Sequence, residues 1–237
     1  MMMKLNKIKY LTPALCLAYS TPSLALKIDT MLLIADEQGN GVYTLTNELA
    51  ETSFISGEIT KLETTEDGKL KRIPYTESNL DDWDITLTHP KVILESDKVK
   101  QVGVRDLCGN DCKTEQDRVY QIIFSPVPYN PEEKETSVNI NFGYAPLFII
   151  PAPEPKISYE MKNLGDRILV ENTGNSFIRF AIDGCTDEVK TQCQASFTSL
   201  AGRTRTFDIP EKLRKNTLKV RVVNYDDSYR KTIEVGR

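Results

Sequence analysis

Short apolar runs separated by turn residues follow one another along almost the whole chain. Most of these runs are rich in β-branched or aromatic residues, and apolar patterns with the helical period of 3.6 are absent at useful length. The strands predicted on this basis are Ile28–Ile34, Val42–Thr46, Phe54–Leu62, Ile85–Leu94, Val99–Val104, Val119–Phe124, Val138–Ile150, Ile157–Tyr159, Arg167–Glu171, Phe177–Ile182, Ser196–Ser199, Arg203–Phe207, Leu218–Val223 and Ser228–Val235. The sequence therefore predicts an all-β protein built from antiparallel sandwiches.

The run Val138–Ile150 is the most informative of these segments. Val138, Ile140 and Phe142 alternate with polar residues, and a continuous apolar run then ends at Pro151. A strand of roughly 14 residues would be about 46 Å long, well beyond the average strand. Because proteins normally blunt an apolar edge of this kind, we expect this one to pair with another chain.

A proline-rich connector divides the predicted strands into two series. Residues 152–156 lie in a segment with prolines at 151, 153 and 155, which is too stiff to let the flanking parts drift. The predicted domains are therefore 26–151 and 157–237, set at an angle by the hinge 152–156. Residues 172–175, with the sequence Asn-Thr-Gly-Asn, predict a hairpin within the second domain.

Residues 1–25 have the pattern of a secretory signal peptide. Lys4, Lys7 and Lys9 precede a short apolar core, and cleavage is expected after Ala25. Removing these three lysines leaves 27 basic and 34 acidic residues, a net charge of −7. An acidic exported chain without a later long apolar segment argues against nucleic-acid binding and against membrane insertion.

Cys108, Cys112, Cys185 and Cys193 remain after cleavage. Cysteines in an exported chain predict disulfides, and the local pairs Cys108–Cys112 and Cys185–Cys193 are the simplest of the three connectivities. The alternative, a zinc site, lacks the spacing of common zinc modules. The sequence predicts neither a metal site nor a cofactor.

Other polar groups give no convergent catalytic set. His89 is the only histidine and precedes a proline, so a catalytic triad is not expected. Residues 81–84 (Asp-Asp-Trp-Asp) lack the glycine of a calcium loop, which favours a solvated turn. Residues 69–72 (Lys-Leu-Lys-Arg) suggest a solvated hairpin tip, with contact to a partner as the alternative. The chain is therefore not expected to be an enzyme.

Several short motifs spread along both predicted domains occur in a specific order. They are residues 147–151 (Leu-Phe-Ile-Ile-Pro), 94–97 (Leu-Glu-Ser-Asp), 118–122 (Arg-Val-Tyr-Gln-Ile), the Val-Pro pair within 124–131, 171–175 followed by 178–180, Cys185 and Cys193, and 223–226 (Val-Asn-Tyr-Asp). Together they give residues 26–237 a pattern that resembles the PapD-like periplasmic chaperones of the chaperone–usher pathway. The features of the second domain are similar to the alternate branch of this family.

The resemblance implies two immunoglobulin-like domains and a function in pilus assembly. Such chaperones fold, cap and deliver fimbrial subunits to an outer-membrane usher in the periplasm, by inserting a donor strand into the incomplete subunit. Val138, Ile140 and Phe142 are the implied subunit-binding residues, since a period of two places them on one face. The resemblance leaves open whether two copies of the free protein cap each other as a dimer. The alternative is a two-domain fimbrial subunit or adhesin.

The chain departs from the family at the basic residues that hold the subunit's terminal carboxylate. The matching positions are Met31 or Leu32 and Ala145 or Pro146, none of which is basic. We therefore expect a carboxylate anchor elsewhere, with Lys27, Arg118 and Lys156 as candidates. When the strand is aligned on Pro151, strict alternation points residues 137, 139 and 141 toward the subunit instead of residues 138, 140 and 142. The predicted register therefore requires a one-residue bulge near Gly143.

Overall fold

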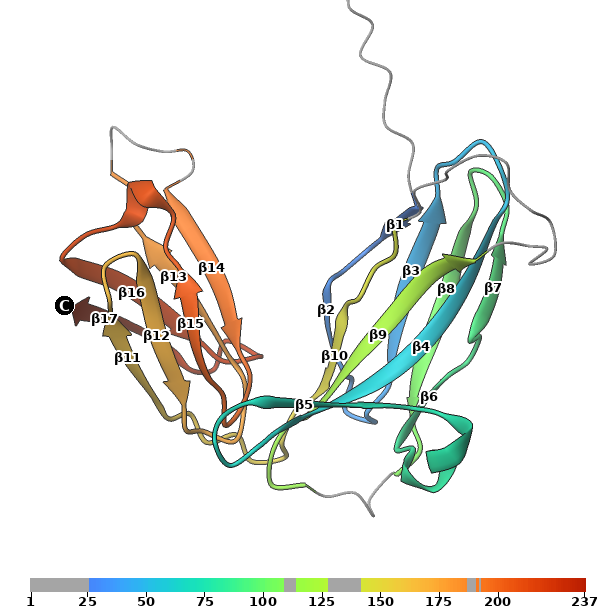
Figure 1. The fold of residues 1–237 in the computed structure, drawn as a ribbon, viewed down its shortest axis with the longest axis horizontal. Coiled ribbons are helices and arrows are strands. Elements are labelled where there is room, and N and C mark those ends of the chain that lie inside the picture. Colours follow the sequence, from blue (N-terminus) through green and yellow to red (C-terminus); the bar gives the residue numbers. More distant parts are fainter. Residues whose placement is uncertain (1–25, 109–113, 128–141, 187–190, 192) are drawn as a thin grey trace, which may run out of the picture.

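Two lobes of β structure, joined at one end and open at the other, make up the protein (Figure 1). The structure is a computed structural model that describes residues 26–108, 114–127, 142–186, 191 and 193–237. Within these residues, no helix has both the length and the apolar character needed to cross a membrane. The prediction of two tandem β-sandwiches at an angle to each other is confirmed.

The first sandwich packs a four-stranded sheet against a six-stranded sheet. Its elements are β1 (Leu26–Ile28), β2 (Leu32–Ile34), β3 (Gly41–Asn47), β4 (Ser53–Thr64), β5 (Leu70–Pro74), the 3-10 helix η1 (Glu77–Asp82), β6 (Ile85–Leu87), β7 (Lys91–Leu94), β8 (Val99–Asp106), β9 (Arg118–Val127) and β10 (Leu147–Ile150). One sheet has the order β1-β3-β8-β6, and the other has the order β2-β10-β9-β4-β5, with β7 also on β4. Alternate residues such as Tyr43 and Leu45, or Ile122 and Phe124, point inward and are fully buried.

The second sandwich is smaller and is built in the same way. Its elements are β11 (Tyr159–Asn163), β12 (Arg167–Asn172), β13 (Ile178–Asp183), β14 (Gln194–Ser199), β15 (Thr204–Asp208), η3 (Glu211–Leu213), β16 (Thr217–Val223) and β17 (Arg230–Gly236). The sheets have the orders β11-β12-β15 and β14-β13-β16-β17. Ile168 and Val170 face Phe180, Val220 and Val222 across the core, and all five side chains are buried.

The predicted hairpin at residues 172–175 is wrong. β12 pairs with β11 and β15, whereas β13 pairs with β14 and β16, so this segment carries the chain from one sheet to the other. The cause is Asn172, which is buried and donates from Nδ2 to the carbonyls of Ser176 at 3.0 Å and Ser199 at 3.1 Å. Its Oδ1 accepts from the backbone N–H of Gly174 at 3.1 Å. Because a buried amide needs several partners, Asn172 stabilises the crossing rather than a simple hairpin.

The long predicted strand is also shorter than expected in its described part. β10 covers only Leu147–Ile150, and Tyr144 forms an isolated antiparallel bridge with Phe124 of β9. Pro146 lies between them and has no N–H to give to the ladder, so the regular pairing is interrupted there. Residues 128–141 lie outside the described part of the chain.

The predicted Cys185–Cys193 disulfide is confirmed, with the two sulfur atoms 2.03 Å apart. It ties the end of β13 to the start of β14 and closes a loop of the second domain. Cys108 is also disulfide-bonded. Its predicted partner Cys112 lies outside the described residues, so that pairing stays a prediction.

A hydrophobic cluster joins the two domains. Leu62, Val119 and Ile149 of the first domain and Phe177 of the second are buried together, with Leu200 packed against them. The hairpin between β4 and β5 reaches across to the second lobe (Figure 1), where Thr64 Oγ1 donates to the carbonyl of Ala201 at 2.9 Å. The interface therefore has an apolar core of its own, which limits relative motion of the domains.

Asp117, just before β9, adds a polar link between the domains. Its Oδ1 accepts from the N–H of Ala152 in the hinge at 2.8 Å, and its Oδ2 accepts from the N–H of Phe177 at 2.7 Å and from Ser176 Oγ at 3.3 Å. Burial raises the pKa of Asp117 above its usual value, although these hydrogen bonds work in the opposite direction. One carboxylate thus holds a strand, the hinge and the second domain together.

This raised pKa gives the stability of the protein a dependence on pH. Because the folded state holds the Asp117 proton more tightly than the unfolded state, its contribution to stability falls as pH rises from about 4 through the folded pKa. Asp117→Asn removes this titration. We expect the stability of the wild type relative to Asp117→Asn to decrease between about pH 4 and 7, as measured by urea unfolding at each pH.

The matched control is Asp208→Asn, since Asp208 is exposed on β15. Its difference from the wild type is expected to stay nearly constant over the same range. If the wild type instead becomes more stable relative to Asp117→Asn as pH rises, the assignment of this pH dependence to Asp117 is wrong.

Candidate functional site

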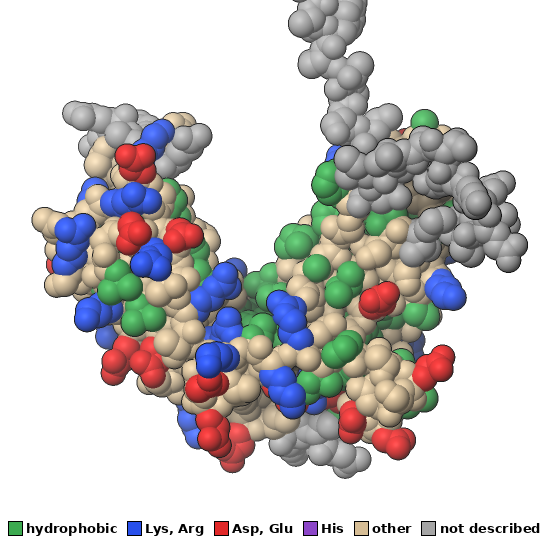
Figure 2. Space-filling model, viewed as in Figure 1, with side chains coloured by type: hydrophobic (Ala, Val, Ile, Leu, Met, Phe, Trp, Pro, Cys, Tyr) green, Lys and Arg blue, Asp and Glu red, His purple; other side chains and the backbone are tan. Residues whose placement is uncertain are grey.

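The valley between the lobes contains a pocket of about 350 Å³ to which both domains contribute. Its apolar lining comes from β4, β5 and β10 and from the segments just before β2 and just after β14, and includes Met31, Leu62, Leu70, Leu147 and Leu200. Figure 2 shows Lys and Arg side chains gathered beside apolar side chains at the base of this valley. An apolar floor edged by cations suits a ligand with both an apolar and an anionic part.

Three arginines line this pocket, and we refer to Arg72, Arg203 and Arg205 as the cleft arginines. Arg72 lies on β5 of the first domain, Arg203 just before β15 and Arg205 on β15 of the second. Arg72 Nη1 donates to Oε1 of Gln121 at 2.6 Å, and the Arg205 guanidinium lies 4.9 Å from the ring centre of Phe207. None of the three makes an ion pair with a residue of the described ranges.

The cleft arginines repel one another. Arg203 is partly buried, and this burial, with the positive charges of Arg205 and Arg72, lowers the pKa of its guanidinium. A lowered pKa means that the charged form is less stable here than in water. An anion placed between these groups would relieve the repulsion, and a carboxylate suits the fork geometry of arginine.

The segment predicted to pair with another chain borders this pocket. Tyr144 packs against the core of the first domain and donates from its hydroxyl to the carbonyl of Leu26 at 2.6 Å, whereas Ala145 and Leu147 line the pocket. Phe142 is 80% exposed and lies outside any strand. Val138 and Ile140, the other two predicted donor residues, lie outside the described part of the chain.

Gly143 lies unusually close to β9. A Cβ at this position would be 2.7 Å from the carbonyl oxygen of Phe124, so a larger residue requires the backbone to move. Uninterrupted alternation from Tyr144 would place Phe142 on the core face, yet Phe142 is exposed. A close approach at a glycine next to a change of phase is typical of a bulge.

The three predicted anchor residues do not lie together in the cleft. Lys27 is on β1 and pairs with Glu48 at 2.5 Å, with more than half of its side chain exposed. Lys156 is exposed, and its backbone N–H donates to Asn175 Oδ1 at 2.6 Å. Neither these two nor Arg118 lines the pocket of the cleft arginines.

Arg118 has a counter-ion of its own. Its guanidinium donates to both carboxylate oxygens of Asp106, at 2.9 and 2.7 Å, and the two side chains are only 8% and 6% exposed. Burial opposes the charged guanidinium, but the bonds to Asp106 and nearby negative charge outweigh it and raise the pKa of Arg118. The pair borders a separate hollow of about 700 Å³ beside the hinge, lined also by Asp36, Pro151 and Tyr225.

Sequence reasoning pointed to two positions of this pocket and did not predict its cations. Of the four positions that match the family's basic residues, Met31 and Ala145 line the pocket, and Leu32 and Pro146 do not. The cations come instead from β5 and from the start of β15. The signal was present in part, because residues 69–72 were considered as a partner contact and Arg203 and Arg205 alternate within a predicted strand.

The buried pair of Arg118 and Asp106 gives a stability prediction. Asp106→Asn replaces one accepting oxygen by an amide and leaves a buried cation without its counter-charge. We expect this to lower the free energy of unfolding by about 3–5 kcal/mol, as measured by urea denaturation followed by tryptophan fluorescence.

The matched control for this variant is Asp166→Asn, since Asp166 lies 3.6 Å from Arg167 in an exposed pair. Loss of this pair is expected to cost at most about 1 kcal/mol. Similar costs for the two variants would refute a special role for the buried pair.

Comparison with solved structures places this architecture among two-domain fimbrial chaperones. Similar structures include the class 5 fimbriae chaperone CfaA, at 15% identity and TM-score 0.52, covering 90% of this chain and 99% of that one. A chain of the Salmonella enterica SafA pilin–SafB chaperone complex matches at 12% identity and TM-score 0.57, covering 92% and 99%. A chain of the CsuC–CsuE chaperone–tip adhesion subunit complex of Acinetobacter baumannii matches at 12% and 0.55, covering 89% and 98%.

At these identities the likeness defines the fold, and the predicted resemblance in fold to chaperone–usher chaperones is confirmed. A sequence comparison then gives the family. Residues 28–151, nearly all of the first sandwich and more than half of the chain, match the CS5 fimbrial protein N-terminal domain. The protein belongs to this family. No curated protein matches the chain.

Proposed function

We propose that this protein is a periplasmic chaperone that folds, caps and delivers fimbrial subunits to an outer-membrane usher by donor-strand complementation. The observation that carries the proposal is the cleft, where cations that make no ion pair with any described residue border an apolar floor and the end of the predicted donor segment. Several of the similar structures are chaperone–pilin or chaperone–adhesin complexes, which supports the same partner class. This function requires no catalytic residues.

The alternative, a two-domain fimbrial subunit or adhesin, is less favoured by the topology. A subunit of this type lacks its last strand and so has an open groove in its sandwich. Here β10 pairs with β2 on one side, in parallel, and with β9 on the other. The first sandwich thus contains the strand that a subunit has to receive, which fits a donor better than an acceptor.

In this proposal, residues 138, 140 and 142 enter the groove of the subunit. This register requires the alternation of side chains between the two faces to shift by one residue before Tyr144. The close approach at Gly143 and the exposure of Phe142 support such a shift. Removal of residues 1–25 in transit places the mature chain in the periplasm. The outer-membrane usher and a second, self-capping copy of this chain are further partners in this proposal.

The cleft arginines are proposed to hold the terminal carboxylate of the subunit. They replace the basic residues that are absent at Met31 and Ala145, and they lie beside the same pocket. The apolar floor then receives the last side chains of the subunit. This assignment takes precedence over Lys27, Arg118 and Lys156 because two of those already have close acidic partners and none of the three lines the pocket.

The donor residues are tested by co-expression with the cognate subunit. Ile140→Asp places an unpaired carboxylate in an apolar groove, which costs several kcal/mol or keeps the strand out. Asn139→Asp, the matched control, changes a residue on the opposite face. We expect the first variant to lose the subunit to proteolysis and the second to protect it, as measured by subunit recovery from the periplasm.

Equal protection by both variants would falsify donor-strand complementation in this register. The reverse result would show that the strand is phased one residue away from the predicted register.

The cleft arginines are tested separately from the donor strand. Arg72→Gln combined with Arg203→Gln removes two charge-assisted contacts to the proposed carboxylate. We expect at least about a tenfold loss in affinity for a purified subunit, since each such contact contributes about 1.5–3 kcal/mol. Lys71→Gln is the matched control, because Lys71 is a neighbouring cation on β5 that points to Glu63, 3.8 Å away.

Lys27→Ala and Lys156→Ala, measured in the same assay, are expected to bind like the wild type. If either of these weakens binding and the double arginine variant does not, the anchor lies at the residues predicted from the sequence.

A further inference from the structure

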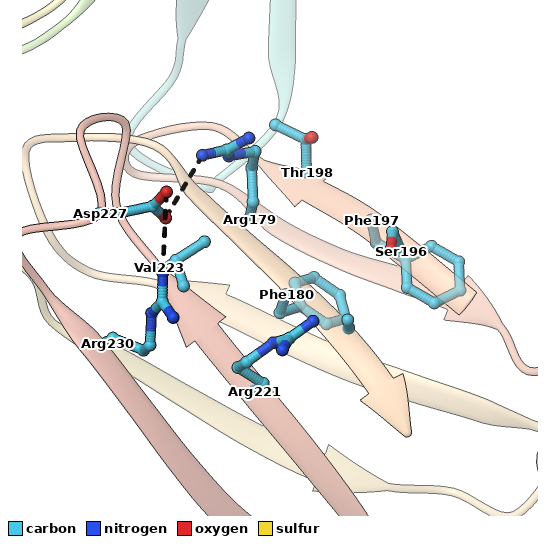
Figure 3. Close-up of a pocket in the computed structure, with 10 residues that line it drawn as sticks. Arg179, Phe180, Ser196, Phe197, Thr198, Arg221, Val223, Asp227 and Arg230 are labelled. Carbon is cyan, nitrogen blue, oxygen red and sulfur yellow. Dashed lines mark ion pairs between the residues drawn. The ribbon is translucent and has the colours of Figure 1, made fainter. Parts of the chain in front are cut away.

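The outer face of the sheet β14-β13-β16-β17 in the second domain contains a hollow of about 440 Å³ (Figure 3). Strand pairing places Arg179 of β13 opposite Thr198 of β14 on one side and Val223 of β16 on the other. Val223 in turn lies opposite Arg230 of β17. Because directly paired residues project from the same face, Arg179 and Arg230 stand in one row with only Val223 between them.

A second row explains why the face is hollowed. Arg221 of β16 lies opposite Ala181 of β13, and Ala181 lies opposite Ser196 of β14. The two small side chains leave space beside the side chain of Arg221. We refer to Arg179, Arg221 and Arg230 as the sheet-face arginines.

These arginines carry more positive charge than their surroundings neutralise. Asp227 is the only acidic residue that lines the hollow, and it lies 3.6 Å from Arg179 Nη2 and 3.9 Å from Arg230 Nη2. Arg221 has no ion pair among the described residues. Arg179 Nε is buried and has no acceptor in the described part of the chain. Three cations with one carboxylate leave a charge of about +2 in the lining of the hollow. Asp183, in a neighbouring row of the same face, has its pKa lowered by the Cys185 backbone N–H and, to a smaller extent, by Lys219 and Arg221.

The remaining polar side chains of the hollow can also donate hydrogen bonds to an anion. Ser196 and Thr198 contribute hydroxyl groups, which donate as well as accept, whereas the guanidinium groups can only donate. A charged, solvated sheet face normally carries both signs of charge. The mature chain as a whole has a net charge of −7, so the positive charge in this hollow is opposite in sign to that of the whole chain. A surface rich in donors and positive charge fits an anionic partner.

We propose that the sheet-face arginines bind an acidic segment of a partner polypeptide. The donors that are open to a ligand favour separate carboxylates over one compact anion, because Asp227 already bridges the guanidinium groups of Arg179 and Arg230 and Arg221 stands in a different row. Asp227 lies between these two arginines and repels a dianion such as phosphate placed there, whereas single carboxylates can pair with Arg221 and with the outer sides of the row. The apolar Val223 supplies contact area for the segment.

This proposal is independent of the proposed function, because it rests on the second domain alone. The test uses the mature protein and a fluorescein-labelled hexaglutamate peptide, with binding followed by fluorescence anisotropy at low salt. Arg221→Gln combined with Arg230→Gln is expected to weaken binding by about tenfold or more, the effect of losing charge-assisted contacts. Arg167→Gln, which changes an exposed arginine of the other sheet, is expected to bind like the wild type.

A second variant tests the hollow without changing its charge. Ala181→Leu fills the space beside Arg221 and is expected to weaken binding of the peptide as well. Circular dichroism shows whether each variant is folded, and only variants with the wild-type spectrum are compared. The pair Arg72→Gln with Arg203→Gln reports the contribution of the cleft and is expected to leave most of the binding intact.

Three results would overturn the proposal. In the first, the peptide binds the double sheet-face variant as tightly as the wild type, or loses its binding only when the cleft arginines are changed. In the second, inorganic phosphate displaces the peptide at an equal concentration of anion, which indicates a small-anion site. In the third, analytical ultracentrifugation finds a dimer that the sheet-face variant abolishes, which assigns the face to a second copy of this chain.

Discussion

The docking of Phe177 onto the first domain is the contact on which the shape of the molecule depends. Its side chain is fully buried against Leu62, Val119 and Ile149, and its backbone N–H donates to Asp117. The two contacts act on the same residue but on different parts of it, so the second domain is fixed both in position and in orientation. A hinge of prolines alone would limit flexibility without selecting one angle. The cleft exists because this contact selects an angle.

The two kinds of buried or partly buried arginine in the protein show how their surroundings decide their use. Arg118 has a carboxylate at hydrogen-bonding distance and contributes a closed, internally satisfied pair. Arg203 faces two other cations across an apolar floor, and its charge is destabilised by them. Desolvated charge without a partner is costly in the free protein, and the same cost becomes favourable binding energy when a partner supplies the opposite charge. Stability explains the first arrangement, and the carboxylate proposed to bind in the cleft would explain the second.

Local patterns in the sequence were sufficient for the fold class and for the Cys185–Cys193 disulfide, because strand period and cysteine spacing are short-range properties. They were not sufficient for the crossing at Asn172, where a polar residue that is typical of turns is buried and donates to the carbonyls of Ser176 and Ser199. The cleft arginines were missed for a related reason. Arg72 and Arg203 are 131 positions apart in the sequence, counted as 203 minus 72, and only the contact between domains brings them together.

The parallel pairing of β2 with β10 has a consequence for how the first domain folds. Leu32 and Leu147 are partners in this ladder and are 115 positions apart, counted as 147 minus 32. Contacts of such high order form slowly, because the entropy of closing a long loop has to be lost before the pairing stabilises it. Until β10 docks, the positions beside β2 and β9 stay unoccupied in the folding chain. A second copy can then insert its own β10 there, so a domain-swapped dimer is the misfolded product expected of this topology.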